Sequence, residues 1–188
     1  FDTRGGPVTI TEDEQPLRGK PEKIPTLKPA FKADGTITAA NSSSISDGAA
    51  ALVLTTAGEA EAAGVTPLAR IVAHASHAQT PETFTTAPLG AIKSVAERAG
   101  WDLASVDLFE INEAFAMVAM LAIDGLGLDE AKVNIHGGAC ALGHPIGALR
   151  ARIVVTLLHA LRRTRGARGI ASLCIGGGEA TALAVELL

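Results

Sequence analysis

Two kinds of apolar segment alternate between residue 57 and the end of the chain, and this order constrains the fold most. Short Val- and Ile-rich stretches typical of strands alternate with stretches whose apolar residues recur at helical spacing. The expected strands are 68–77, 106–111, 169–174 and 180–188, and the expected helices are 57–64, 87–100, 114–125 and 148–163. This alternation predicts one compact α/β unit. Residues 114–125 are apolar all round, which predicts a buried helix.

The first part of the chain has a different character. Residues 1–33 are polar, carry five prolines and show no helical period, so we expect an extended connecting segment before a domain spanning 34–188. Within that domain we expect a short strand at 35–40 and a helical turn leading into a buried strand at 48–56. The polar stretch 41–47 predicts a loop. The chain opens without a methionine and in mid-connection, which is typical of an internal segment of a longer protein.

Composition excludes several classes of function. The chain is 47% hydrophobic but only 3% aromatic, so we expect an aliphatic core. A net charge of −4 gives no electrostatic footprint for nucleic acid, and no apolar run reaches the ~18 residues of a membrane span. Two cysteines without framework spacing and no visible signal peptide indicate a reducing, cytoplasmic setting. The cluster Arg162, Arg163, Arg165 and Arg168 reads as a solvated helix end, or alternatively as a phosphate-binding patch.

One histidine lies among an unusual number of glycines. His144 belongs to NIHGGACALGHPIG at 134–147, where glycines let a substrate approach backbone N–H groups closely. An imidazole beside bare amides can stabilise an oxyanion and move a proton. The alternative interpretation is a histidine that caps the following helix. The other histidines, His74, His77, His136 and His159, are assigned to structure or surface.

Two further residues are candidates for chemistry. Cys174 ends an expected strand in CIGGG, and a thiol near amides and an imidazole can have a lowered pKa and act as a base or nucleophile. It is otherwise a small buried hydrophobe, as we expect for Cys140. Asn112 stands between a strand and a helix, where it either caps the helix or holds a water or the imidazole. The cysteines and histidines lack the spacing of a zinc site, so no metal is expected.

These motifs resemble the C-terminal half of the thiolases, the acetyl-CoA C-acetyltransferases. The resemblance covers nearly the whole chain in the family's order and rests on NEAFA (112–116), GGACALGHPIG (137–147), CIGGG (174–178), LKPAF (27–31), DGTITAAN (34–41) and DGAAALVL (47–54). It implies the layered α/β fold of thiolases, with this chain as the C-terminal half, and CoA-dependent thiolysis of acetoacetyl-CoA or the reverse Claisen condensation of two acetyl-CoA molecules. Coenzyme A is then a substrate, and no permanently bound cofactor is implied. The resemblance also implies fatty acid metabolism.

The resemblance also implies residue roles. His144 would activate the nucleophilic cysteine and donate to the thioester oxygen. Cys174 would remove the α-proton of the second acetyl-CoA, and Asn112 would hold the water that completes the first oxyanion hole. The Gly176 amide would serve the second oxyanion hole. Three residues would lie along the pantetheine of CoA: Ser43, Ala114 and Phe115.

The resemblance also shows what is missing or altered. No segment resembles the motif of the nucleophilic cysteine, so we expect this chain alone to be inactive and to need an N-terminal thiolase half, on the same chain or as a partner. The complete protein would be a dimer or tetramer, and a lone half would expose an apolar face. Leu149 and Arg150 stand where thiolases have small residues, and Ser44 replaces a common glycine. The alternative function is a non-catalytic acyl-CoA or lipid-binding protein.

Overall fold

The structure is a computed structural model that describes residues 2–188, so Phe1 of the expected segment 1–33 lies outside it. The described chain divides into a unit that ends at Ala40 and a second unit, Asn41–Leu188. Secondary structure of the first unit is short: β1 (Asp2–Thr3) pairs antiparallel with β2 (Gly6–Pro7), followed by α1 (Glu14–Arg18) and the 3₁₀ helix η1 (Pro21–Thr26). The helix α1 forms despite Pro16 because the proline sits in the first turn, where no backbone N–H is needed.

The second unit is built on one mixed sheet of four strands. These are β3 (Ala69–Ala78), β4 (Leu108–Ile111), β5 (Arg168–Cys174) and β6 (Glu179–Leu187), in the order β3-β6-β5-β4. The strands β5 and β6 form the expected antiparallel pair, and β3 pairs antiparallel with β6. Only the β4–β5 pair is parallel, with Ile111 opposite Ser172. The carboxyl ends of β4 and β5 therefore meet at one end of the sheet.

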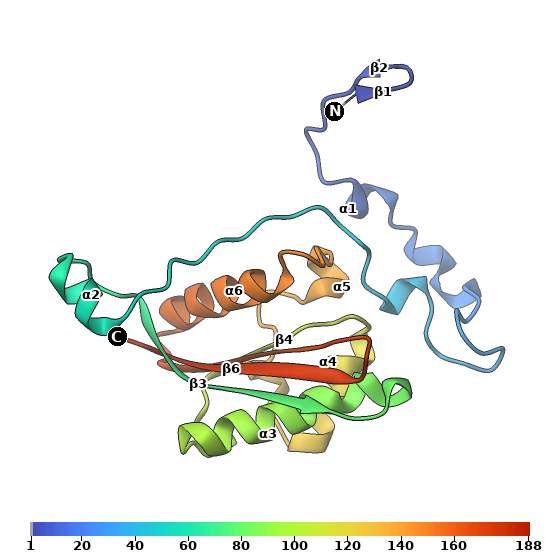
Figure 1. The fold of residues 1–188 in the computed structure, drawn as a ribbon. Helices are drawn as coiled ribbons and strands as arrows, with labels where there is room; N and C mark the ends of the chain where they lie inside the picture. The colour runs from blue at the N-terminus through green and yellow to red at the C-terminus, as the bar shows by residue number, and fades with distance from the viewer. Residues whose placement is uncertain (1) are drawn as a thin grey trace. The chain divides into compact units, whose positions relative to one another are not determined.

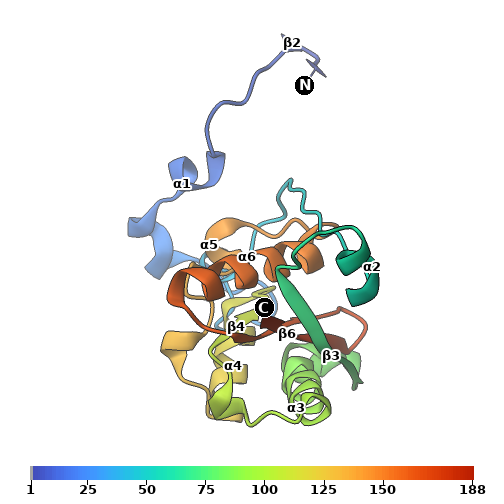
Figure 2. The ribbon, with the colours of Figure 1, turned by 90° about the vertical axis from the view of Figure 1, so that its left-hand side faces the viewer.

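Helices cover both faces of this sheet. Figure 1 shows α6 (Leu149–Thr164) on one face, and α3 (Ala87–Ala99) and α4 (Ala116–Leu126) on the other. The end-on view in Figure 2 shows the same three layers. The shorter elements are α2 (Ala57–Ala62), α5 (Ala139–Leu142) and the 3₁₀ helices η2 (Ala39–Asn41), η3 (Pro81–Thr86), η4 (Leu103–Ser105) and η5 (Glu130–Lys132).

Two hydrophobic clusters hold the layers together. One joins α3, α4 and the sheet, and the other joins α6 to the opposite sheet face. Both are almost entirely aliphatic, as the composition predicts; Phe109 is the largest fully buried side chain. The helix α6 approaches the sheet closely at Gly169, where an added Cβ would lie 2.8 Å from Leu157. Small residues at this strand therefore set the depth of the helix layer.

The expected strands and helices of residues 57–188 are confirmed within a few residues. Two expectations before them are wrong. Residues 35–40 form no strand, and 48–56 form neither a helical turn nor a buried strand. The side chains of Leu52, Val53 and Leu54 are exposed, with Val53 at 97%. A strand needs a paired neighbour to satisfy its backbone, and the described residues supply none here. The helix α4 is also less buried than expected, because Met120 is 65% exposed.

A tight turn joins β5 to β6 and fixes the loop that follows Cys174. Gly178 has φ +102°, and its carbonyl accepts from the backbone N–H of Gln79. A Cβ at Gly178 would lie 2.2 Å from the Gln79 carbonyl oxygen. Only glycine combines that backbone conformation with so close an approach.

We therefore expect Gly178→Ala to lower the free energy of unfolding by at least about 2 kcal/mol, because it adds both backbone strain and a clash. Gly58→Ala is the matched control: Gly58 lies in α2 with nothing within 4 Å of an added Cβ. That change should be neutral or stabilising by up to about 1 kcal/mol. Urea unfolding of both variants checks the prediction. Equal stabilities would contradict it.

Candidate active site

The candidate residues gather where β4 and β5 end. Asn112 directly follows β4, and its backbone N–H donates to the Ser172 carbonyl at 2.9 Å, which extends the parallel pairing by one residue. Cys174 is the last residue of β5, two positions beyond Ser172. The two strand ends thus place Asn112 and Cys174 on neighbouring strands, at the edge where parallel strands present functional groups.

His144 reaches the same edge from a distant part of the sequence. Its Nε2 lies 3.1 Å from the side-chain Nδ2 of Asn112, and the amide donates when that ring nitrogen is unprotonated. Asn112 is 1% exposed. The cap of α4 is Phe115 and the cap of α6 is Ala148, neither through a side chain. Asn112 and His144 therefore contact each other and cap neither helix.

The polar loop predicted at 41–47 packs between these two segments. Ser44 accepts from the His144 backbone N–H at 2.9 Å, and the Ser46 N–H donates back to the His144 carbonyl at 3.4 Å. Ser43 donates its hydroxyl to the Ala114 carbonyl at 2.9 Å. Ser42 forms an isolated bridge with Phe115. The three residues expected along pantetheine, Ser43, Ala114 and Phe115, thus come together beside His144.

Two buried polar atoms at this site have no hydrogen-bond partner among the described residues. They are Oδ1 of Asn112 and Nδ1 of His144. Buried polar atoms are normally paired, and an unpaired one costs about 1–3 kcal/mol. Such atoms are typical of a site whose remaining partner is solvent or a bound molecule. The arrangement can offer an amide and an imidazole to a polar group that enters there.

Cys174 differs from expectation in one respect. Its thiol is buried in the core between the sheet and α3, and burial raises its pKa, where the sequence suggested a lowered one. Desolvation disfavours the thiolate. No hydrogen bond joins the Cys174 and His144 side chains within residues 2–188, so their cooperation stays a prediction. Gly176 is exposed in the turn after β5, and a Cβ there would meet nothing within 4 Å.

The structure also shows where three other residues discussed in the sequence analysis lie, namely Arg150, Arg168 and Cys140. Arg150 is exposed and Leu149 is buried in the α6 core, so this departure from the small-residue pattern fits without a buried charge. Arg168 is not part of a helix end: it lies on β5 over the Trp101 ring at 5.2 Å. Cys140 is only half-buried and belongs to neither core cluster. Burial and the nearby Glu113 raise its pKa to about 11.

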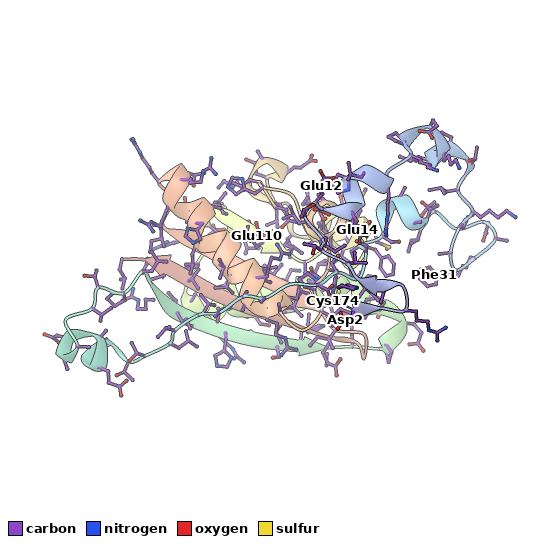
Figure 3. The ribbon with its side chains drawn as sticks, turned by 90° about the horizontal axis from the view of Figure 1, so that it is seen from above. Asp2, Glu12, Glu14, Phe31, Glu110 and Cys174 are labelled. Carbon is purple, nitrogen blue, oxygen red and sulfur yellow. The ribbon has the colours of Figure 1, made fainter. Side chains whose placement is uncertain are left out.

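Sequence reasoning missed a buried ion pair behind the site. Glu110 of β4 faces α6, where Arg152 Nη1 lies 3.9 Å from its carboxylate, and Figure 3 labels Glu110 beside that helix. Burial raises the pKa of Glu110 to about 7, opposed by Arg152 and increased by Glu113. Burial also lowers the pKa of Arg152. The sequence shows a glutamate in an apolar strand and an arginine in an expected helix. It does not show that these two side chains contact each other.

Two further features of residues 2–188 concern metal binding and membrane spans. Their His, Cys, Asp and Glu side chains form no group of three or more that could hold a metal ion. None of their helices is both long and apolar enough to cross a membrane.

Comparison with known families gives two matches along the chain. Residues 65–187 match the family "Thiolase, C-terminal domain", and residues 1–58 match "Thiolase, N-terminal domain". The boundary between the two matches lies further along the chain than the boundary at residue 33 expected from composition.

The individual proteins that match the chain are also thiolases or acetyl-CoA acetyltransferases. The chain is 50% identical over 187 residues to the mouse "Acetyl-CoA acetyltransferase, cytosolic", a match that covers 98% of the chain and 47% of that relative. The crystal structure of the Bacillus anthracis acetyl-CoA acetyltransferase matches with a TM-score of 0.91 and 43% identity, over 100% of this chain and 48% of that one. Acat5 thiolase from Ascaris suum in complex with coenzyme A matches with a TM-score of 0.85 and 42% identity, over 95% and 47%. The chain thus has the thiolase fold and spans about half the length of these relatives.

The Glu110–Arg152 pair predicts how stability depends on pH. A carboxyl whose folded pKa of about 7 exceeds its unfolded value of 4.5 contributes stability below pH 4.5, and this contribution is lost as pH rises through 7. We expect the free energy of unfolding to fall by on the order of 3 kcal/mol over this range relative to Glu110→Gln, which does not titrate. Urea unfolding at pH 4.5 and pH 8 gives the difference. Parallel pH profiles for the two proteins would contradict the assignment.

Proposed function

Because the chain belongs to the thiolase family, we propose that it is part of an acetyl-CoA C-acetyltransferase. The reaction is CoA-dependent thiolysis of acetoacetyl-CoA, or the reverse Claisen condensation of two acetyl-CoA molecules. Coenzyme A and its thioesters are the substrates, as the CoA complex of the Ascaris suum thiolase suggests. The assignment to fatty acid metabolism and to the cytoplasm is part of the same proposal, and for the second the cytosolic mouse relative is the support.

The contact between Asn112 and His144 is the observation that carries this proposal. It joins a strand end to a loop 32 residues further along the chain, and it leaves one buried atom on each side chain unpaired. A water can donate to Oδ1 of Asn112, and the protonated Nδ1 of His144 can donate to a thioester carbonyl. Such preplaced donors act where charge develops in the transition state, and losing one typically lowers the rate by ~10²–10³-fold.

Four residues share the chemistry in this proposal. His144 takes the proton of a nucleophilic cysteine supplied by the N-terminal half, whose thiolate then attacks the acyl carbon while CoA leaves. Asn112 holds the water that completes the oxyanion hole of His144, and the exposed amide of Gly176 serves the acyl-enzyme carbonyl. Cys174 exchanges the proton on the α-carbon of the second acetyl-CoA. Ser43, Ala114 and Phe115 lie along the pantetheine.

Burial of the Cys174 thiol is compatible with an acid–base role in both directions of the reaction. Burial raises its pKa, so the thiol is protonated at neutral pH and starts as an acid. In thiolysis it donates this proton to the α-carbon of the departing acetyl-CoA enolate. In condensation the deprotonated sulfur removes the same proton, and a desolvated thiolate is a stronger base for it.

The proposal includes an N-terminal thiolase half as a partner. Residues 1–58 match the N-terminal domain family, and the chain covers 47% of the mouse relative. The exposed apolar side chains of Leu52, Val53 and Leu54 lie within this matched region. We propose that the N-terminal half covers them and that the complete protein is a dimer or tetramer.

The purified chain alone should form no acyl-enzyme with radiolabelled acetyl-CoA, because neither of its two cysteines lies in the nucleophile's motif. The complete protein, with the N-terminal half on the same or a separate chain, should be labelled on that half. Acid-stable label on the isolated chain would refute this division of labour.

In the complete protein, Cys174→Ala should reduce acetoacetyl-CoA thiolysis by at least about 10²-fold, because a positioned acid–base group contributes that much. His144→Ala should do the same. His159→Ala, an exposed histidine on α6, is the matched control and should keep full activity. Unchanged thiolysis in Cys174→Ala would instead favour the non-catalytic acyl-CoA or lipid-binding alternative.

A further inference from the structure

Glu113 and Asn134 connect the two segments that carry Asn112 and His144. The side-chain Oδ1 of Asn134 accepts from the Ile111 N–H at 2.8 Å, and its Nδ2 donates to the Ile111 carbonyl at 2.8 Å. The amide therefore pairs with the end of β4 as a neighbouring strand would. The same Nδ2 lies 3.3 Å from Oε1 of Glu113. Asn134 thus binds the residues on both sides of Asn112.

Glu113 extends this connection to the other segment. Its second carboxylate oxygen, Oε2, accepts from the backbone N–H of Cys140 at 3.1 Å. Cys140 belongs to the short helix α5, which ends two residues before His144. One carboxylate therefore joins the residue after Asn112 to the helix before His144. Hydrogen bonds to a charged acceptor are about twice as strong as neutral ones.

The surrounding backbone is shaped around this carboxylate. A Cβ at Gly138 would lie 2.3 Å from Oε2 of Glu113, so only glycine leaves room for the carboxylate there. Asn134 itself has φ 49°, a left-handed conformation that Asn tolerates better than most residues. The hydrogen bonds of Glu113 and Asn134 therefore depend on two unusual backbone positions, the glycine at 138 and the left-handed residue at 134.

We propose that Glu113 and Asn134 are positioning residues that hold Asn112 and His144 in contact. Among residues 2–188, no hydrogen bond joins either side chain to His144. They act through Asn112 on one side and through α5 on the other, and the inference rests on the proposed function only in taking this contact as the catalytic one. A shift of about 1 Å at such a contact can lower the rate by ~10²-fold.

Two substitutions separate this role from folding. Glu113→Gln keeps the shape of the side chain and the acceptor for Asn134, but its NH₂ group cannot accept from the Cys140 N–H. Asn134→Gly keeps the left-handed backbone at no steric cost and removes the three side-chain hydrogen bonds. Glu130→Gln, an exposed carboxylate in η5, is the control.

The first readout is spectroscopic and needs no turnover. In the complete protein labelled with ¹⁵N, Glu113→Gln and Asn134→Gly should each shift the side-chain amide signal of Asn112 and the ring nitrogen signals of His144, while Glu130→Gln leaves them in place. Unmoved signals in Glu113→Gln would overturn the inference. Because Glu113→Gln is isosteric, it carries the test even if Asn134→Gly does not fold.

The second readout is kinetic. Glu113→Gln should lower kcat roughly tenfold to a hundredfold with KM unchanged within about twofold, since it removes positioning and no substrate contact. In an Asn112→Ala background the same substitution should lower kcat by a smaller factor than in the wild-type background, because the contact between residues 112 and 144 that it disturbs is already lost. Multiplying effects would overturn the inference. A complete protein without any thiolysis would count against the proposed function and leave the spectra to decide this inference.

Discussion

The parallel pairing of β4 with β5 is the constraint on which the site depends. It is the only parallel pair in the sheet, and it is short: four residues of β4, all buried, align with residues 169–172 of β5. Because parallel strands end at the same edge, Asn112, which follows β4, and Cys174, the last residue of β5, become neighbours without being close in sequence. The antiparallel partner β6 then returns from the same edge and creates the tight turn that contains Gly176.

The second constraint is that polar groups at this edge are buried and must find partners. Asn112 is 1% exposed, and its amide is directed to His144. The carboxylate of Glu113 accepts from the backbone of Cys140, and the amide of Asn134 pairs with the backbone of Ile111. Glu110 and Arg152 are different, since their 3.9 Å separation and burial give a pair that stabilises little. Of these polar groups, Glu113 and Asn134 determine the geometry of the site, whereas the ion pair of Glu110 and Arg152 adds little stability.

Much of this fold follows from local sequence patterns. Helices such as α3 end where expected, because Gly100 adopts the left-handed conformation that closes a helix. The antiparallel β5–β6 pair follows from two apolar runs around GGG. The prediction for residues 48–56 is wrong. Their apolar sequence favours a buried strand, but no neighbouring strand among the described residues pairs with them. Strand formation depends on tertiary pairing, which local sequence does not encode.

The sequence predicts candidate site residues but not the contacts that hold them in place. The glycines around His144 and Cys174, together with the thiolase resemblance, identified the candidates. Glu113 and Asn134 belong to the motifs NEAFA and NIHGGACALGHPIG, but the sequence does not show their contact, because it joins segments 21 residues apart. The sequence likewise did not show the raised pKa of Cys174, since it depends on burial of the thiol in the folded core. Long-range contacts and desolvation are properties of the folded chain alone.

We propose that an imidazole and a thiol from two distant segments act on the same thioester. A crystal structure of the complete protein with a bound acyl-CoA thioester tests this most directly. We expect the thioester oxygen within hydrogen-bond distance of His144 and the sulfur of Cys174 facing the α-carbon. A thioester that contacts only one of these two side chains would contradict it.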